Sequence, residues 1–129
     1  MQLAESALYI ALLGILLTLT SAFVTILRGK TGILFGDGGN DTLARARRAH
    51  TTVLEFGVTF LLLMIAYELL GGSATWIMWL AIAFIITRLI HVLYQFKFDG
   101  LHFTRAIGTF GSHIVNIIFV VLILVQLYV

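Results

Sequence analysis

Four long apolar segments constrain this chain more than any other feature of its sequence. A helix that crosses the hydrocarbon core of a bilayer needs about 20 consecutive, mainly apolar residues. The alternating pattern of outer-membrane barrel strands does not occur. The sequence therefore predicts an all-α integral membrane protein, a four-transmembrane-helix bundle in which residues 1–129 form a single membrane domain. The predicted spans are residues 7–27, 51–70, 74–96 and 106–129.

The composition agrees with residence in a membrane. Hydrophobic residues make up 60% of the chain and charged residues only 11%, whereas a soluble domain averages about 25% charged residues. The chain contains no cysteine, which excludes disulfides, thiolate metal ligands and a cysteine nucleophile. The four histidines show no metal-ligand spacing, so we expect no metal site.

The basic residues are concentrated on one side of the predicted bundle. They lie in the connection after the first span, in the connection after the third span, or in the adjoining helix halves, whereas the connection 71–73 and both termini have none. The positive-inside rule therefore predicts that both termini lie outside the cytoplasm. The eight basic residues are Arg28, Lys30, Arg45, Arg47, Arg48, Arg88, Lys97 and Arg105.

Each predicted span also carries a polar stripe in its cytoplasmic half, because residues three, four and seven positions apart share one face of a helix. Serine and threonine often bond back to their own helix, so single hydroxyl groups favour no function. Together the stripes predict a polar pocket that opens to the cytoplasm. They comprise Thr18, Ser21, Thr25 and Arg28; Arg48, Thr52, Glu55 and Thr59; Arg88, His91 and Gln95, with Tyr94 beside them; and Arg105, Thr109, Ser112 and Asn116, with His113 adjoining.

Glu55 and Arg88 are predicted to lie inside the hydrocarbon at similar depths on antiparallel helices. At about 1.5 Å rise per residue, Glu55 lies roughly 10 Å beyond Arg48 and Arg88 lies roughly 14 Å before Lys97. A lone charge near the membrane centre costs at least about 2.5–3.5 kcal/mol, so we expect the two side chains to form an ion pair. The sequence leaves open whether this Glu55–Arg88 pair is purely structural or belongs to a ligand pocket.

The chemistry of the predicted pocket favours an anionic guest that forms hydrogen bonds. Arg28, Arg48 and Arg105 supply guanidinium forks for carboxylates, and Glu55 could hold an ammonium group. A zwitterionic peptide with more negative than positive charge fits this set. Further hydrogen-bonding groups come from His50, His91 and Thr52.

The connection after the first span is rich in glycine and reads GILFGDGGND over residues 32–41. Glycine combined with Asp and Asn favours turns, because these residues tolerate positive φ. A phosphate-binding loop would need the pattern GxxxxGK[ST] between a strand and a helix, which this stretch lacks. We therefore interpret it as a structural turn rather than a ligand cradle.

Residues 45–55 read RARRAHTTVLE, which resembles the second-helix signature RxxRAHxNxxE of the MAPEG family (membrane-associated proteins in eicosanoid and glutathione metabolism). The LFGDGG stretch before it resembles that of small bacterial members. RLIH at residues 88–91 matches the third-helix pattern R-x-x-H, and Arg105 matches the arginine that begins the fourth helix. The resemblance covers nearly the whole chain. It implies a homotrimer of four-helix subunits in a bacterial inner membrane.

The resemblance also implies glutathione as co-substrate, because several family members bind it between neighbouring subunits on the cytoplasmic side. Arg105, carried over by position, would be the catalytic residue near the sulfur. A cation there would lower the pKa of a thiol from about 8.5 and raise the thiolate fraction. A lipophilic small molecule or lipid would arrive from the bilayer. The implied glutathione-binding residues are Arg48, His50 and Glu55 from one subunit, joined by Arg28 and His91, with Thr52 in place of the signature asparagine and Tyr94 one position before the family tyrosine.

Two functions remain open at this point. One is a glutathione-dependent membrane transferase, which conjugates lipophilic electrophiles or reduces peroxides. The other is a non-catalytic protein of the same fold that binds a lipid or a partner; a small transporter is a third candidate. The family pattern is altered at Thr52, at Gln95 in place of tyrosine and at Thr109 in place of an aromatic hydroxyl. These changes suit weak catalysis, another thiol or binding without chemistry. No nucleic acid partner is expected.

Overall fold

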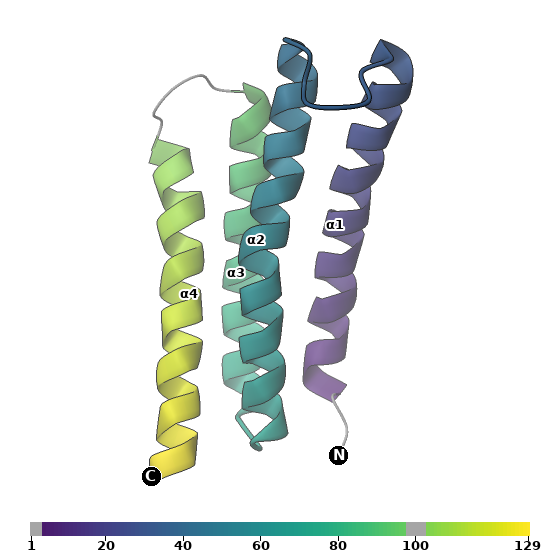
Figure 1. The fold of residues 1–129 in the computed structure, drawn as a ribbon. Coiled ribbons are helices and arrows are strands. Elements are labelled where there is room, and N and C mark those ends of the chain that lie inside the picture. The colour runs from purple at the N-terminus through teal and green to yellow at the C-terminus, as the bar shows by residue number, and fades with distance from the viewer. Residues whose placement is uncertain (1–3, 98–102) are drawn as a thin grey trace.

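The computed structural model describes residues 4–97 and 103–129, and these residues form four long helices (Figure 1). Consecutive helices run antiparallel, and each is long and apolar enough to cross a membrane. The prediction of an all-α four-helix membrane bundle is therefore confirmed. Helix α1 covers Ala4–Thr31, α2 covers Asp41–Leu69, α3 covers Ala74–Lys97 and α4 covers Phe103–Tyr128.

The two ends of the bundle differ in charge. Helices α1 and α3 end, and α2 and α4 begin, at the end drawn uppermost in Figure 1. The eight basic residues lie there or in the adjoining helix halves, and we call it the basic end. The opposite end holds the start of α1, the tight turn between α2 and α3, and the end of α4.

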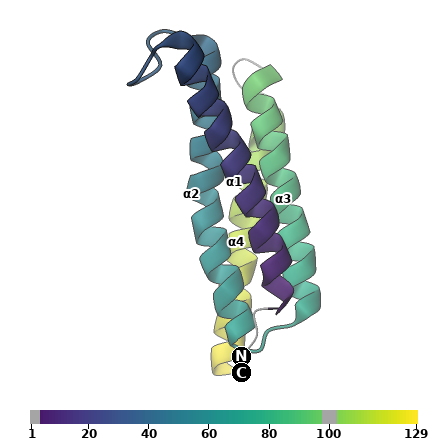
Figure 2. The same cartoon turned by 90° about the vertical axis from the view of Figure 1, so that its right-hand side faces the viewer.

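Helices α2 and α3 occupy the middle of the bundle. Helix α1 packs on α2 and α3, and α4 packs on α3 and α2, whereas α1 and α4 do not touch in the part of the chain that the structure describes. Figures 1 and 2 show α1 and α4 on opposite sides of the central pair. Helix α1 accordingly buries only Ser6 and Leu13, so most of its surface is uncovered.

Three phenylalanine rings form the centre of the apolar core. Phe60 and Phe84 stack with 4.0 Å between ring centres, and Phe119 meets Phe60 edge-on at 5.8 Å. Aromatic pairs in such geometries add stability beyond the area that they bury. Leu13 of α1 approaches α2 over Gly57, where an added Cβ would lie 3.2 Å from the leucine Cδ2. The buried polar side chains Thr52, Arg88, His91 and Ser112 lie in the half of the bundle nearer the basic end.

Glu68 ties the start of α1 to the end of α2. Its carboxylate accepts hydrogen bonds from the backbone N–H groups of Glu5 at 2.8 Å and Ser6 at 2.9 Å. The first N–H groups of a helix have no partner within the helix, and a negative charge also suits the positive end of the helix dipole. Helix α1 is therefore fixed at this end although it buries little surface.

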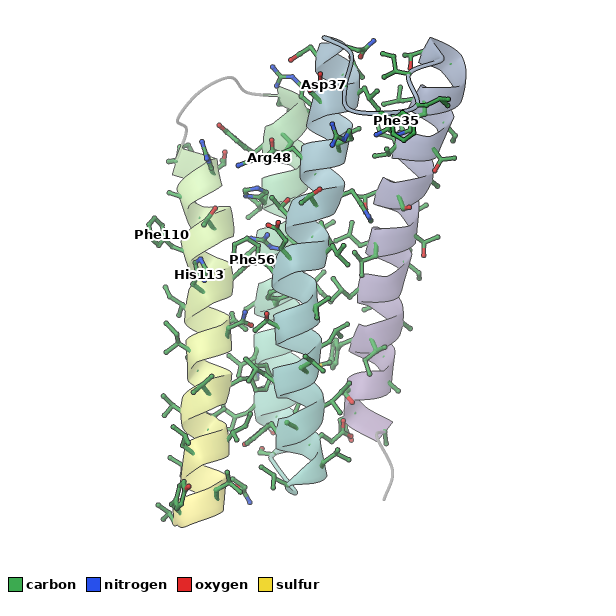
Figure 3. All side chains as sticks on the ribbon, viewed as in Figure 1. Phe35, Asp37, Arg48, Phe56, Phe110 and His113 are labelled. Atoms are coloured by element: carbon green, nitrogen blue, oxygen red, sulfur yellow. The ribbon has the colours of Figure 1, made fainter. Side chains whose placement is uncertain are left out.

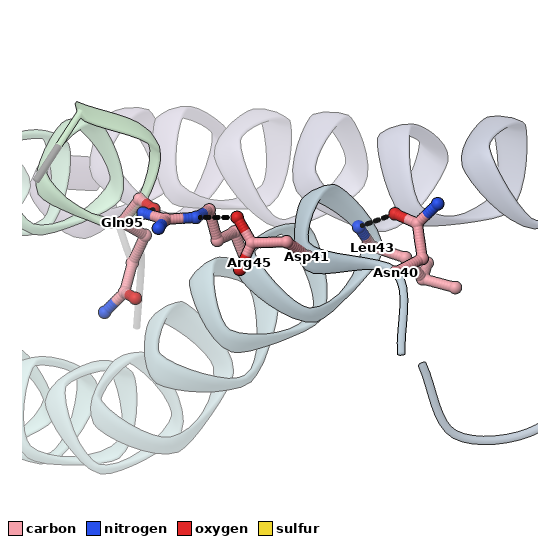
Figure 4. Close-up of polar contacts among 5 residues, drawn as sticks. All are labelled: Asn40, Asp41, Leu43, Arg45 and Gln95. Atoms are coloured by element: carbon pink, nitrogen blue, oxygen red, sulfur yellow. Dashed lines mark hydrogen bonds and ion pairs between the residues drawn. The ribbon is translucent and has the colours of Figure 1, made fainter. Parts of the chain in front are cut away.

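Helix α2 begins at Asp41, well before the predicted apolar span at residue 51. The Asn40 side chain caps it by accepting a hydrogen bond from Leu43 N at 2.9 Å. Arg45 then donates to the Asp41 carboxylate at 2.7 Å and to the Gln95 carbonyl oxygen of α3 at 3.0 Å (Figure 4). The arginine-rich stretch is thus a helical extension beyond the apolar span, and it is bound to the end of α3.

Candidate functional site

The predicted site residues lie on opposite sides of α2. Glu55 lines a groove shared with α4, whereas His50 contacts α1. Successive residues of a helix are about 100° apart, so Arg48 and His50 project in nearly opposite directions, and Figure 3 shows Arg48 on the α4 side of α2. We call the two groups the α4-side cluster (Arg48, Glu55, His91 and Arg105) and the α1-side cluster (Arg28 and His50).

His91 is the buried member of the α4-side cluster. It is buried against α4, where Gly108 permits the contact: an added Cβ would lie 2.7 Å from the His91 Cβ. Arg88, Arg105 and Arg48, from α3, α4 and α2, all lie within electrostatic range of the His91 ring. Its Nε2 lies 3.0 Å from the Gln95 side-chain nitrogen, and its Nδ1 is buried without a hydrogen-bond partner among the described residues. Three helices thus bring two accessible cations and an imidazole together.

Arg88 is fully buried and forms no ion pair with Glu55 in the described structure. Its guanidinium donates to the backbone carbonyl of Thr52 on α2 at 3.4 Å and to that of Gly108 on α4, and it lies 4.4 Å from the centre of the Phe56 ring. The predicted Glu55–Arg88 pair is therefore wrong for the single chain. Arg88 points into the interface of three helices and Glu55 points out of it, so carbonyls and an aromatic face replace the carboxylate.

A groove of about 370 Å³ runs between α2 and α4, and we call it the α2–α4 groove. Glu55 is exposed there, and His113 meets the Phe56 ring edge-on at 4.9 Å (Figure 3). The Asn116 Oδ1 is buried without a hydrogen-bond partner in the described part of the chain. The sequence pattern does not indicate a role for Phe56, although this residue directly follows the signature glutamate. The groove is lined by Glu55, Phe56, Thr59, Leu63, His113, Asn116, Ile117 and Val120.

The α1-side cluster is bound to α1 and to the connection that follows it. His50 Nδ1 lies 3.0 Å from the Thr20 hydroxyl oxygen. Arg28 Nη1 donates to the carbonyl oxygens of Ile33 at 2.9 Å and Gly36 at 3.1 Å. The guanidinium still has its Nε and Nη2 donors for an anion. Arg28 therefore holds the connection after α1 in place.

The two clusters do not converge within one chain. The resemblance implied that Arg48, His50 and Glu55 of the same subunit would contact one ligand. In the structure the body of α2 separates His50 from the other two side chains, so contact of all three with one ligand stays a prediction. Each cluster alone offers only part of the predicted donor set.

The polar stripe predicted on α1 lies on an uncovered face. Thr18, Ser21 and Thr25 line one shallow depression of about 550 Å³ together with Leu17, Ala22 and Ile26. The Thr25 hydroxyl donates to the Ser21 carbonyl oxygen at 3.1 Å, which is the back-bonding common for threonine in helices. This face of α1 carries three hydroxyl groups, and no other helix of the described chain covers it.

The histidines do not form a metal centre in the described structure. His50 faces α1, His91 lies between α3 and α4, and His113 lines the α2–α4 groove. His102 lies outside the described residues. Among residues 4–97 and 103–129, no three potential metal ligands gather in one place.

The arginines, histidine and glutamate at the basic end of this bundle correspond to a known family pattern. The sequence model of the MAPEG family matches residues 6–125. This chain belongs to the MAPEG family. Comparisons with curated proteins and with solved structures give no significant match. Membership indicates a membrane protein of glutathione-related or eicosanoid metabolism without specifying an activity.

Several positions of this MAPEG member differ from the signature, and the structure accounts for what the replacements do. The Thr52 hydroxyl donates to the Arg48 and Ala49 carbonyl oxygens of its own helix, and the side chain is only 8% exposed. Gln95, in place of a tyrosine, contacts His91. Tyr94 is buried beside His91, with 6.1 Å between ring centres. In the single chain, Thr52 and Tyr94 are therefore less accessible to a ligand than Arg48 and Glu55, which are exposed.

Proposed function

We propose that this MAPEG protein is a glutathione-dependent membrane transferase whose site forms between two neighbouring subunits of a homotrimer. This proposal rests on the position of the predicted ligand-binding side chains, which lie on two opposite sides of α2 within one subunit. In a cyclic assembly, one face of each subunit meets a different face of the next. Such contacts would bring the α1-side cluster of one subunit beside the α4-side cluster of its neighbour. The two clusters together would then supply all the hydrogen-bond donors that were predicted for one ligand.

The uncovered faces of the subunit support this assembly. The exposed Glu55 would face hydrocarbon in an isolated subunit, and the buried Asn116 Oδ1 in the same groove has no hydrogen-bond partner among the described residues, so both are costly at that depth. Serine and threonine hydroxyl groups pair with such acceptors across helix contacts in membranes. The hydroxylated face of α1, with Thr18, Ser21 and Thr25, offers this complement to the α2–α4 groove of a neighbour.

The assembled site has the chemistry that glutathione requires. Arg48 of one subunit and Arg28 of the next supply guanidinium groups for its two carboxylates. Glu55 holds the ammonium group, and His50 and His91 form hydrogen bonds with the peptide. A net positive site suits a ligand that carries two carboxylates and one ammonium group.

Arg105 acts on the sulfur in this proposal. A neighbouring cation stabilises the thiolate, which is the nucleophilic form of a thiol. The thiolate attacks an electrophilic carbon, a sulfur–carbon bond forms, and the leaving group departs with its electron pair. Glutathione enters from the cytoplasmic side at the basic end, while the lipophilic electrophile arrives from the bilayer.

The replaced signature positions favour a second candidate, a MAPEG protein that binds a lipid or a partner without chemistry. The Thr52 hydroxyl is engaged with its own helix, and Gln95 contacts His91 at the place of a family tyrosine. Neither side chain supplies the amide or phenol contact of the family signature. This candidate keeps the fold and the groove but predicts no product.

A conjugation assay on the purified protein separates the two candidates. With a chromogenic aryl halide, the transferase forms product at a rate that saturates with glutathione and that S-methylglutathione inhibits. Saturable glutathione binding without product would favour the non-catalytic candidate. Absence of both product and glutathione binding would overturn the proposed function.

A further inference from the structure

The connection between α1 and α2 presents two large apolar side chains to the outside. Leu34 is 74% exposed and Phe35 is 89% exposed. Apart from the last two residues of the chain, no large apolar side chain in the described structure is more exposed. Contiguous exposed apolar surface at one defined place marks an interaction site more often than scattered single residues do.

Hydrogen bonds hold this pair in place on both sides. Arg28 Nη1 donates to the carbonyl oxygen of Ile33, just before the pair, and to that of Gly36, just after it, at 2.9 and 3.1 Å. Ile33 packs beneath Gly38, where an added Cβ would lie 2.9 Å from the isoleucine Cδ1. Leu34 and Phe35 are thus the outward side of a braced loop whose inward side is Ile33.

The rest of the connection, up to the start of α2, has a defined backbone conformation. Gly36 and Gly38 adopt positive φ values of 62° and 56°, which other residues rarely adopt. Asp37 accepts hydrogen bonds from Gly39 N at 3.1 Å on its carboxylate and from Asn40 N at 2.8 Å on its carbonyl oxygen. The backbone therefore specifies how far the apolar pair projects.

The loop projects sideways and back toward the apolar part of the bundle. In Figure 1 the connection runs below the tips of both helices, and in Figure 2 it extends beyond α2. Figure 3 shows Phe35 nearer the middle of the bundle than Asp37. The exposed Lys30 stands in the last turn of α1, just before the loop. An apolar pair below and a cation beside it match the order of acyl chains and phosphates at a bilayer surface.

We propose that Leu34 and Phe35 anchor the basic end in the bilayer by inserting at the boundary between headgroups and acyl chains. The occupant of this surface is lipid, with Lys30 beside the phosphates. Aromatic and aliphatic side chains gain from burial at this boundary, and a lysine nearby adds attraction to anionic headgroups. The anchor fixes the depth of Arg28, because the same loop carbonyls hold its guanidinium.

The absence of cysteine makes this anchor directly measurable. A single Phe35→Cys variant carries an environment-sensitive fluorophore in vesicles of phosphatidylcholine and phosphatidylglycerol. Thr42→Cys, exposed in the first turn of α2, is the matched control. We expect phosphatidylcholine with a nitroxide near the start of its acyl chain to quench position 35 several-fold more than position 42. Aqueous iodide should quench the two positions in the opposite order.

Two outcomes would overturn the anchor. Equal access of iodide to both positions, without quenching by the lipid nitroxide, would place Phe35 in water. Shielding of position 35 from both quenchers would show that a second copy or another protein covers it. Should Phe35→Cys fail to assemble, Leu34→Cys provides the same comparison from the adjacent exposed residue.

Discussion

Arg88 is buried in the half of the bundle nearer the basic end, with main-chain carbonyls and a phenyl ring as its partners rather than a carboxylate. Its guanidinium joins α3 to the backbones of α2 and α4. Removing it would leave the carbonyls of Thr52 and Gly108 without this donor and would open a cavity. The contact is therefore a structural link among three helices, independent of Glu55.

Stability measurements distinguish this link from an ion pair. Arg88→Ala should lower the free energy of unfolding in detergent by roughly 1.5–3 kcal/mol, the usual worth of hydrogen bonds that a charged group donates. Glu55→Gln should lower the melting temperature much less, because Glu55 forms no ion pair with Arg88 in the described structure and glutamine keeps a hydrogen-bonding side chain in the α2–α4 groove. Equal losses in both variants would restore the ion pair, formed in that case between subunits or after rearrangement.

Substitution of Arg105 tests whether this residue is catalytic. It stands in the first turn of α4, where a cation gains nothing from the helix dipole. A charge-assisted hydrogen bond to the reacting thiolate is worth about 1.5–3 kcal/mol, or roughly ten- to a hundredfold in rate. Arg105→Ala should therefore lower turnover and leave glutathione affinity within a few-fold, whereas Arg48→Ala should mainly weaken binding. Wild-type turnover in Arg105→Ala would remove the catalytic role.

At the scale of elements, the contact between α3 and α4 depends on a glycine. An added Cβ at Gly108 would lie 2.7 Å from the His91 Cβ and 2.9 Å from its Nδ1. Gly108→Ala should therefore separate the helices and destabilise the protein by about 1–3 kcal/mol. Gly29→Ala is the control, since nothing lies within 4 Å of its added Cβ. Thermal unfolding checks both, and equal melting temperatures would contradict close packing at Gly108.

The helices themselves could be predicted from the sequence, but their ends could not. Hydropathy marks the part of a helix that lies in hydrocarbon, and α2 continues beyond that part. Its true start depends on the Asn40 cap and the Asp41–Arg45 pair. Those residues are ordinary at the surface of any loop. Their roles as helix cap and ion pair can be recognised only once the position of the helix end is known.

The stripe periodicity predicted which residues share a helix face, but not which neighbour covers that face. His50 and Arg48 were expected at one ligand, yet α1 covers one side of α2 and α4 the other. The helical rise correctly predicted that Arg88 and Glu55 lie at similar depths. The prediction that their side chains form an ion pair was wrong for the single chain. Rotation about the helix axis is decided by packing, such as the close approach at Gly108, and a single sequence does not state that packing.

At the scale of the whole molecule, charge predicts the orientation in the membrane. All eight basic residues lie toward the basic end, and the opposite end has none. The positive-inside rule then places Val129 outside the cytoplasm. A C-terminal alkaline phosphatase fusion should be active and a fluorescent-protein fusion dark in bacterial cells. The reverse pattern would invert the topology and move the glutathione site to the other side.

Mixed trimers test whether two subunits share one glutathione site. Arg48→Ala disables the α4-side cluster and Arg28→Gln disables the α1-side cluster, so neither homotrimer should bind glutathione well. Random mixing of the two variants restores an intact pair of clusters at about a quarter of the subunit contacts in a cyclic assembly. We expect co-expressed trimers to recover glutathione binding near that fraction of wild type, measured by calorimetry on the purified mixture. Binding that stays at the level of the separate variants would place both clusters in the same subunit's site and contradict a site shared between subunits.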